Sequence, residues 1–280
     1  MKVGLVVLFI LGFTATCFAA TVGGPDMSIP EHSLFIKTKA VNDTLDRYEY
    51  NMNVKATFDV EIMVNRDLES AEADTPTAEL KGQAYMVKIA NNFFDTFEPY
   101  VQVGSSVFEA EWDQYGRDVR IESSPGFTWG VGFKLKMFES ADYGVKLTLD
   151  AKYRDADLSI DKAKLRGSVS RASSKEEVFK IEEWQVSILA SKRGILPIGV
   201  NDYYVVPYAG VTYSSTIVDA RFIQGTHGIL YSTFDANDEN PLGVVLGCDI
   251  MPFFLSHYLW NIELRLVNET AFSLGGTIKF

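Results

Sequence analysis

The sequence predicts an all-β fold: a transmembrane, up-and-down antiparallel β-barrel of about ten strands, with eight or twelve as the alternatives. Three observations predict it: a central hairpin with one apolar face, a secretory signal at the start, and connections that alternate between short and long.

The central hairpin spans Gly126 to Arg154 and gives the clearest pattern. Apolar residues occupy every second position from Phe127 to Met137 and again from Tyr143 to Tyr153, while Gly, Thr, Lys and Asp fill most positions between them. Because successive side chains on a strand point to opposite faces, each strand has one apolar face and one face rich in glycine and charge. Each strand also has roughly the 9–11 residues that a tilted strand needs to cross a bilayer. An apolar outside and a polar lumen are typical of a membrane barrel.

The N-terminus has the features of a secretory signal. Met1 and Lys2 form a short basic start, an apolar run follows as far as Phe13, and small residues lead to a predicted cleavage after Ala19. We therefore expect a signal peptide at 1–19, a periplasmic lead-in at 20–47 and a barrel at 48–280.

The two cysteines bear on this interpretation. An alternative signal would use Cys17 as a lipid-modified residue, although the positions before it lack the usual leucine-like residue. After cleavage only Cys248 remains, which excludes an intramolecular disulfide, and its place on an apolar face predicts a small lipid-facing side chain.

Composition does not distinguish a membrane barrel from an acidic enzyme, since the chain is 47% hydrophobic and 22% charged with a net charge of −11. The alternation is more specific. It predicts strands within 48–64, 83–89, 100–107, 126–137, 143–154, 184–190, 205–213, 244–250, 258–266 and 271–280.

The connections between these strands alternate in length. Short joins lie near 91–97, 139–142, 193–202 and 251–257, and long joins lie near 66–80, 112–125, 155–179 and 219–241. Short periplasmic turns and longer outside loops have this asymmetry, and the short turn at 268–270 is the one exception. Aromatic residues crowd the short joins and predict an interfacial girdle there.

The last strand carries Phe272, Leu274, Ile278 and the terminal Phe280 on one face. It resembles the closing strand of Gram-negative outer-membrane β-barrel proteins, a group that includes small porin-like and opacity-type barrels. The resemblance is one of architecture. It implies a place in the cell outer membrane, contact with its lipid and lipopolysaccharide, and recognition of these four residues by the barrel-assembly machinery. We expect a monomer without a cofactor or metal, and the acidic chain argues against nucleic acid.

The predicted lumen is charged. Its face carries Asp59, Glu61, Lys134, Lys136, Lys146, Asp150, Lys152, Arg154, Asp249, Glu263 and Arg265. A barrel of about eight strands is filled by side chains, whereas an open channel needs about 16. We therefore predict a lumen plugged by paired charges, with Glu263 and Arg265 among the contributors and Asp249 as one candidate partner. A narrow pore for small solutes is the alternative.

The long joins hold the remaining candidates. The join at 155–179 carries Lys162, Lys164, Arg166, Arg171 and Lys175, a candidate contact for lipopolysaccharide phosphates or simply a solvated loop. A hydrolytic site could combine His227 with Asp219, Ser232 and Asp235, but no motif spacing supports it. The sequence thus predicts a non-enzymatic surface or structural protein whose loops contact a ligand or another cell. A minor alternative is a soluble periplasmic barrel of the lipocalin type.

Overall fold

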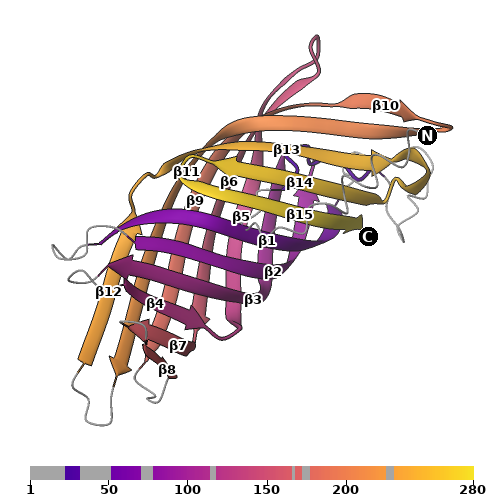
Figure 1. The fold of residues 1–280 in the computed structure, drawn as a ribbon. Helices are drawn as coiled ribbons and strands as arrows, with labels where there is room; N and C mark the ends of the chain where they lie inside the picture. Colours follow the sequence, from indigo (N-terminus) through magenta and orange to yellow (C-terminus); the bar gives the residue numbers. More distant parts are fainter. Residues whose placement is uncertain are drawn as a thin grey trace.

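The computed structural model describes residues 23–31, 52–70, 78–113, 118–165, 168–171, 177–224 and 230–280. Ten antiparallel strands close into a barrel, which confirms the predicted fold (Figure 1). They are β1 (Met52–Ser70), β2 (Ala78–Phe93), β3 (Phe97–Asp113), β5 (Gly126–Ser140), β6 (Val145–Leu158), β9 (Val178–Lys192), β11 (Asn201–Gln224), β13 (Leu242–Pro252), β14 (Tyr258–Leu266) and β15 (Glu269–Lys279). Strand β1 pairs with both β2 and β15, which closes the ring.

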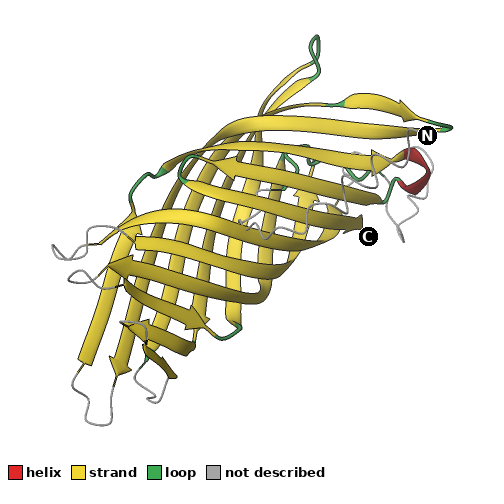
Figure 2. Ribbon diagram, in the orientation of Figure 1, coloured by secondary structure: helices red, strands yellow, loops and turns green. Residues whose placement is uncertain are grey.

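The only helical element in the described residues is the single turn η1 (Phe253–Leu255), so almost everything in Figure 2 is strand. No described helix has the length and apolarity needed to cross a membrane.

Three of the four long joins contain strands, so the prediction of loops there is wrong in form. They hold β4 (Asp118–Ser123), β7 (Ile160–Leu165), β8 (Ser168–Arg171) and β12 (Leu230–Asp238), which continue the ladders of their neighbours. The fourth join is mostly taken up by the ends of β1 and β2, which stay paired as far as Leu68 and Ala78. We call the end of the barrel with these four long joins the outer end, and the end with the short turns the inner end.

The barrel narrows from ten strands to eight toward the outer end. Strands β14 and β15 meet in a tight turn at Val267 and Asn268, and β12 pairs directly with β1 beyond it. The eight-stranded ring is closed by the pairings Leu68↔Ala78, Leu80↔Ala110, Ala110↔Ile121, Ile121↔Ala163, Leu158↔Phe179, Phe179↔Ala220, Val218↔Ala236 and Leu68↔Asp238. We call the two parts the ten-stranded section and the eight-stranded section.

The two faces of the wall exchange character where the sections meet. In β9, Trp184 is 59% exposed on the outside while Glu183 is buried inside, yet further out Phe179 and Ile181 are the buried residues and Lys180 and Glu182 face outward. The interior of the eight-stranded section is an apolar cluster. It contains Met63, Leu68, Ala78, Leu80, Phe108, Ala110, Trp112, Val119, Ile121, Ala156, Leu158, Ile160, Ala163, Phe179, Ile181, Val218, Ala220 and Ala236.

The outside of the ten-stranded section is apolar. Phe127 is 61% exposed, and Trp129 and Phe133 are also exposed. This is incompatible with a lipocalin-type barrel, whose bulky residues would line a central cavity. Aromatic rings lie at both edges of the apolar wall. At the outer edge the Tyr153 ring meets Trp129 edge to face and Trp184 at a tilt, with centroids 5.7 and 4.7 Å apart, and exposed Phe94, Phe138 and Phe254 lie at the inner turns.

Two hairpins project at the inner end, and one of them joins β5 to β6 (Figure 1). The predicted short turn at 193–202 is a hairpin in which β10 (Gly194–Ile198) pairs with the start of β11, and every residue of β10 is exposed. Figure 1 shows it extending past the neighbouring strands.

Candidate functional site: the occluded lumen

The predicted lumen charges lie inside the ten-stranded section. Asp59, Glu61, Lys134, Asp150, Lys152, Arg154, Asp249, Glu263 and Arg265 are all buried. Lys136 and Lys146 lie at the inner end and are partly exposed, where Lys136 pairs with Glu139 at 2.7 Å and Lys146 with Asp26 at 2.6 Å. The side chains fill the lumen in three layers below the apolar cluster.

The outermost of these layers is a network around Arg66. Its guanidinium lies 2.7 Å from Asp238, 3.0 Å from Glu183 and 3.2 Å from Glu269, and it also donates to Ser214. All these groups are buried or nearly so. Such a network is stable only when its charges are paired and its donors satisfied.

Arg154 and Arg265 extend this network across the barrel. Arg154 pairs with Glu61 and, at 2.7 Å, with Glu183. Arg265 pairs with Glu269 at 3.0 Å and more distantly with Glu263, and donates to Gln185 at 2.7 Å, so three arginines share four glutamates and one aspartate.

Sequence reasoning missed Arg66, Glu183 and Glu269. The register of β1 shifts between Met63 and Arg66, so both residues face inward although three positions separate them. A bulge of this kind breaks the period of two on which the assignment of faces depends. In the sequence, the bulge in β1 is marked only by the charged Arg66, which follows the end of the apolar alternation at Val64.

The middle layer is built from tyrosines and paired charges. Tyr100 donates to Asp150 at 3.1 Å and lies under the Lys88 ammonium, which is 3.4 Å from Asp59. Tyr208 donates to Glu263 at 2.8 Å. Both rings depend on inward glycines, because a Cβ at Gly132 or Gly247 would lie 2.5 or 2.1 Å from a ring carbon.

The partners of Glu263 and Arg265 differ from those predicted. Asp249 accepts from Asn261 at 2.6 Å and is not paired with Arg265, whose strongest partners come from β9 and β15. Glu263 lies 3.7 Å from Arg265 and also accepts from the backbone N–H of Gly23 at 3.2 Å. The reason is depth: Arg265 lies near the outer layer, whereas Asp249 lies nearer the inner end.

The inner layer is the N-terminal segment, which we define as Gly23–Glu31. The predicted periplasmic lead-in at 20–47 placed these residues outside the barrel, but the structure places them inside its inner mouth; residues 20–22 and 32–47 lie outside the described part of the chain. Asp26, Met27 and Ile29 are 1–3% exposed.

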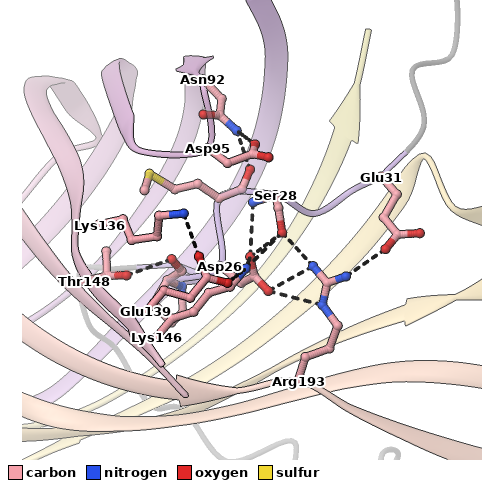
Figure 3. Close-up of polar contacts among 12 residues, drawn as sticks. Asp26, Ser28, Glu31, Asn92, Asp95, Lys136, Glu139, Lys146, Thr148 and Arg193 are labelled. Atoms are coloured by element: carbon pink, nitrogen blue, oxygen red, sulfur yellow. Dashed lines mark hydrogen bonds and ion pairs between the residues drawn. The ribbon is translucent and has the colours of Figure 1, made fainter. Parts of the chain in front are cut away.

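Asp26 is the centre of this layer (Figure 3). Its carboxylate accepts from Lys146 at 2.6 Å, from the Ser28 hydroxyl at 2.6 Å and from Arg193 at 3.0 Å. Burial alone would raise the pKa of Asp26, but these hydrogen bonds and the two cations lower the pKa to about 2.

The space left between these layers is small. One cavity of about 30 Å³ separates the N-terminal segment from the wall beside Lys55 and Asp59, and another of about 10 Å³ lies beside Glu61 and Arg154. At the roughly 10–15 Å³ that one water molecule requires, the first has room for about two waters and the second for about one.

Some of the other predicted site residues lie outside the described part of the chain, and the described ones lie on strands of the eight-stranded section. Lys162 lies on β7, 3.4 Å from both Glu122 and Asp161, and Lys164 is exposed on the same strand. Arg171 lies on β8 opposite Lys162, while Arg166 and Lys175 lie outside the described residues. Asp219 and Asp235 are cross-strand partners, Ser232 is paired with Phe222, and His227 lies outside the described residues.

Comparison with protein-family models and with curated proteins gives no match. Among solved structures, the chain is similar to the translocator domain of autotransporter NalP from Neisseria meningitidis, with 11% identity over 84% of this chain and 91% of that one and a TM-score of 0.35. The transport unit of the autotransporter AIDA-I from Escherichia coli matches with 7% identity over 86% and 92% and the same TM-score. A monoaromatic hydrocarbon channel, a TodX deletion mutant, matches with 9% identity over 83% and 90% and a TM-score of 0.22. Similarity at this level says nothing about function.

Proposed function

We propose that this protein is an integral outer-membrane β-barrel with a closed lumen and no enzymatic activity, which holds its eight-stranded section at the cell surface. The observation that carries the proposal is the exchange of faces between the two sections. An apolar outside with a charged inside suits a wall in lipid, and an apolar inside with a charged outside suits a wall in water.

The boundary between the apolar and the charged outer surface lies at the same level on neighbouring strands. On β9 it falls between Glu182 and Trp184, and on β6 it falls between Tyr153 and Asp155. Trp and Tyr rings prefer the membrane–water interface, which supports placing the outer leaflet headgroups at this level.

The three layers of the lumen support a barrel that does not conduct. Ion passage would require displacing the N-terminal segment, breaking the Arg66 network and crossing the apolar cluster, and the two cavities found beside these layers are small. A surface scaffold needs no such path.

Planar-bilayer recording tests this directly. We expect the intact protein to be silent and Arg265→Ala to stay silent as well, because the N-terminal segment and the apolar cluster still close the lumen on either side of the lost contact. Arg120→Ala, which removes an exposed ion pair on the eight-stranded section, is the matched control and should stay silent. A large steady conductance in the intact protein would overturn the closed lumen and favour the alternative of a narrow solute pore.

An eight-stranded section at the cell surface could contact lipopolysaccharide or another cell. Few of its described cations are free to bind an anion. Its cations are largely matched by carboxylates: Arg120 lies 2.6 Å from Glu109, and Lys180 lies 2.5 Å from Glu182. Lys162, Lys164, Arg166, Arg171 and Lys175 remain our proposed anion contact, and Arg166 and Lys175 of this set lie outside the described residues. Labelling Lys164 with a membrane-impermeant amine reagent on whole cells, and again on the Lys164→Gln chain, would test its location.

The closing strand supports delivery by the barrel-assembly machinery. Phe272, Leu274, Ile278 and Phe280 carry the proposed signal, and the backbone N–H of Phe280 donates to Val54 at 2.9 Å where the barrel closes. Deleting Phe280 should leave the precursor exported but slow to insert, so that it accumulates in the periplasm. Normal insertion would refute this role of Phe280 without affecting the fold.

A further inference from the structure

The inner mouth presents a set of donors that all point at the N-terminal segment. Lys134 donates to the carbonyl of Gly24 at 2.7 Å, Thr148 to Pro25 at 3.1 Å, Lys55 to Met27 at 2.7 Å and Lys279 to Glu31 at 3.3 Å. These contacts are to backbone carbonyls, which every peptide carries.

Two side chains of the segment add selectivity. The Asp26 carboxylate is held by Lys146 and Arg193, and the Arg193 guanidinium also reaches Glu31 at 2.7 Å (Figure 3). The same guanidinium lies 5.1 Å from the centre of the Tyr204 ring. Three residues later, Ile29 packs into an apolar cluster with Val206, Met251 and Leu259. The wall thus has a cationic pocket and an aliphatic pocket, and the residues that fill them are three positions apart in the segment.

Without the segment, Lys134, Lys146, Arg193 and Lys279 would each lose a partner. Carboxylates of the wall would remain beside some of the cations, since Glu98 lies 2.6 Å from Lys55 and Glu139 lies 3.8 Å from Lys146. Buried cations of this kind require an anionic or carbonyl-rich partner. The N-terminal segment supplies both, although only a few of its residues provide the contacts.

We propose that the inner mouth is a binding site for short acidic peptides with a carboxylate three residues before an aliphatic residue. The chain's own N-terminal segment fills this site, and a peptide supplied from the inner side exchanges with it. The site does not depend on the surface role proposed above, because it is built entirely from the inner end of the wall.

The test uses the full chain in detergent. The substitution Cys248→Ser removes the one native thiol expected after signal cleavage, so that a thiol introduced elsewhere can be followed alone. In this chain Asp26→Arg places a cation against Lys146 and Arg193 and should release the segment. The substitution Met27→Cys, at a buried position, reports release by the rate at which its thiol reacts with a charged reagent, which we expect to rise about tenfold or more. Gel mobility of the unheated barrel and its circular dichroism show whether the variant has folded.

Binding is then measured with a fluorescent, acetylated peptide of sequence 23–31. We expect it to bind the Asp26→Arg chain and to bind the parent chain at least about tenfold more weakly, because the parent site is filled. The matched peptide with Asp26→Asn should bind the released chain about tenfold more weakly, the effect of losing a charged hydrogen bond. A peptide with Ile29→Asp should not bind.

Two results would overturn the proposal. In one, the released and folded chain binds none of the peptides, which would make the mouth a tether for the segment alone. In the other, the thiol introduced by Met27→Cys stays protected both in Asp26→Arg and in the double variant with Ile29→Asp, which would make the segment a permanent part of the barrel. If Asp26→Arg does not fold, Ile29→Asp provides the same measurement, because it should release the segment from the apolar cluster while it leaves Lys146 and Arg193 in place.

Discussion

The ten-stranded and eight-stranded sections are built largely from the same strands, yet their interiors have opposite chemistry. Between Arg66 and the inner end the lumen is filled by paired charges and tyrosines. Between Arg66 and the outer end it is filled by Leu80, Phe179 and other apolar side chains. The difference teaches that the interior follows from what surrounds the wall. A wall whose apolar side faces outward must place its polar side in the lumen, whereas a wall in water can bury its apolar side.

Strand number reinforces the contrast. A ring of eight strands leaves just enough room for side chains, so an apolar cluster can fill it completely. Ten strands leave more room, and here long arginines, tyrosines and an inserted segment occupy it. The tight turn between β14 and β15 marks where the ten-stranded section ends and the eight-stranded section begins.

The largest expected effect is that of Arg66→Ala. The substitution leaves the Asp238 carboxylate without its guanidinium partner and removes one of the two cations beside Glu269, and should lower the free energy of unfolding by roughly 3–5 kcal/mol. Equilibrium urea unfolding of the refolded barrel measures it. If Arg66→Ala proves as mild as the loss of an exposed cation, the polar interior is not a tightly coupled network.

Leu80→Ala tests the apolar interior and should cost about 2–5 kcal/mol, because a fully buried side chain leaves a cavity. Val87→Ala, on the outer wall of the same strand, is the matched control and should cost less, since surrounding lipid or detergent fills the space. Limited proteolysis should cut the eight-stranded section of Leu80→Ala first. Equal cleavage of both variants would contradict a separate apolar interior.

Acid should affect the inner mouth before the apolar interior. The pKa of Asp26 is lowered from 3.8 to about 2, so its contribution to docking is complete above about pH 4 and is lost as the pH falls through about 2. The shift corresponds to about 2 kcal/mol. A spin label at Glu31→Cys should gain mobility over this interval, and should change less in an Asp26→Asn chain, where no carboxylate titrates at that position. No gain in mobility down to about pH 2 would show that backbone contacts alone hold the segment.

The smallest effect is expected on the outer surface of the eight-stranded section. Arg120 pairs with Glu109 at 2.6 Å, but its side chain is 41% exposed, so Arg120→Ala should cost about 0–1 kcal/mol and less in high salt. Unfolding measured at two salt concentrations checks this. A cost near that of Arg66→Ala would erase the distinction between the charges of the two regions.

The sequence was sufficient to predict which side chains of the ten-stranded section share a face. Asp150 and Arg154 were assigned to the lumen, and Trp129 to the outer wall, from alternation alone. The position of Arg66 could not be predicted in this way, because the bulge in β1 shifts the period at one unmarked place. The apolar interior beyond it was missed for a related reason: residues such as Phe179 share the inward parity of Glu183, and a polar lumen offered no reason to expect apolar side chains there.

By itself the sequence determined ten alternating strands, their order and their apolar outer wall, since a period of two is a local property of each strand. Only the tertiary structure decided that β12 pairs with β1 on the outer side of the turn at Val267, and that Gly23–Glu31 lies inside the barrel. Both arrangements join residues far apart in the chain, such as Leu68 with Asp238 and Gly24 with Lys134. Such pairings depend on how the ring closes and on which donors remain unsatisfied inside it, and no local pattern encodes either.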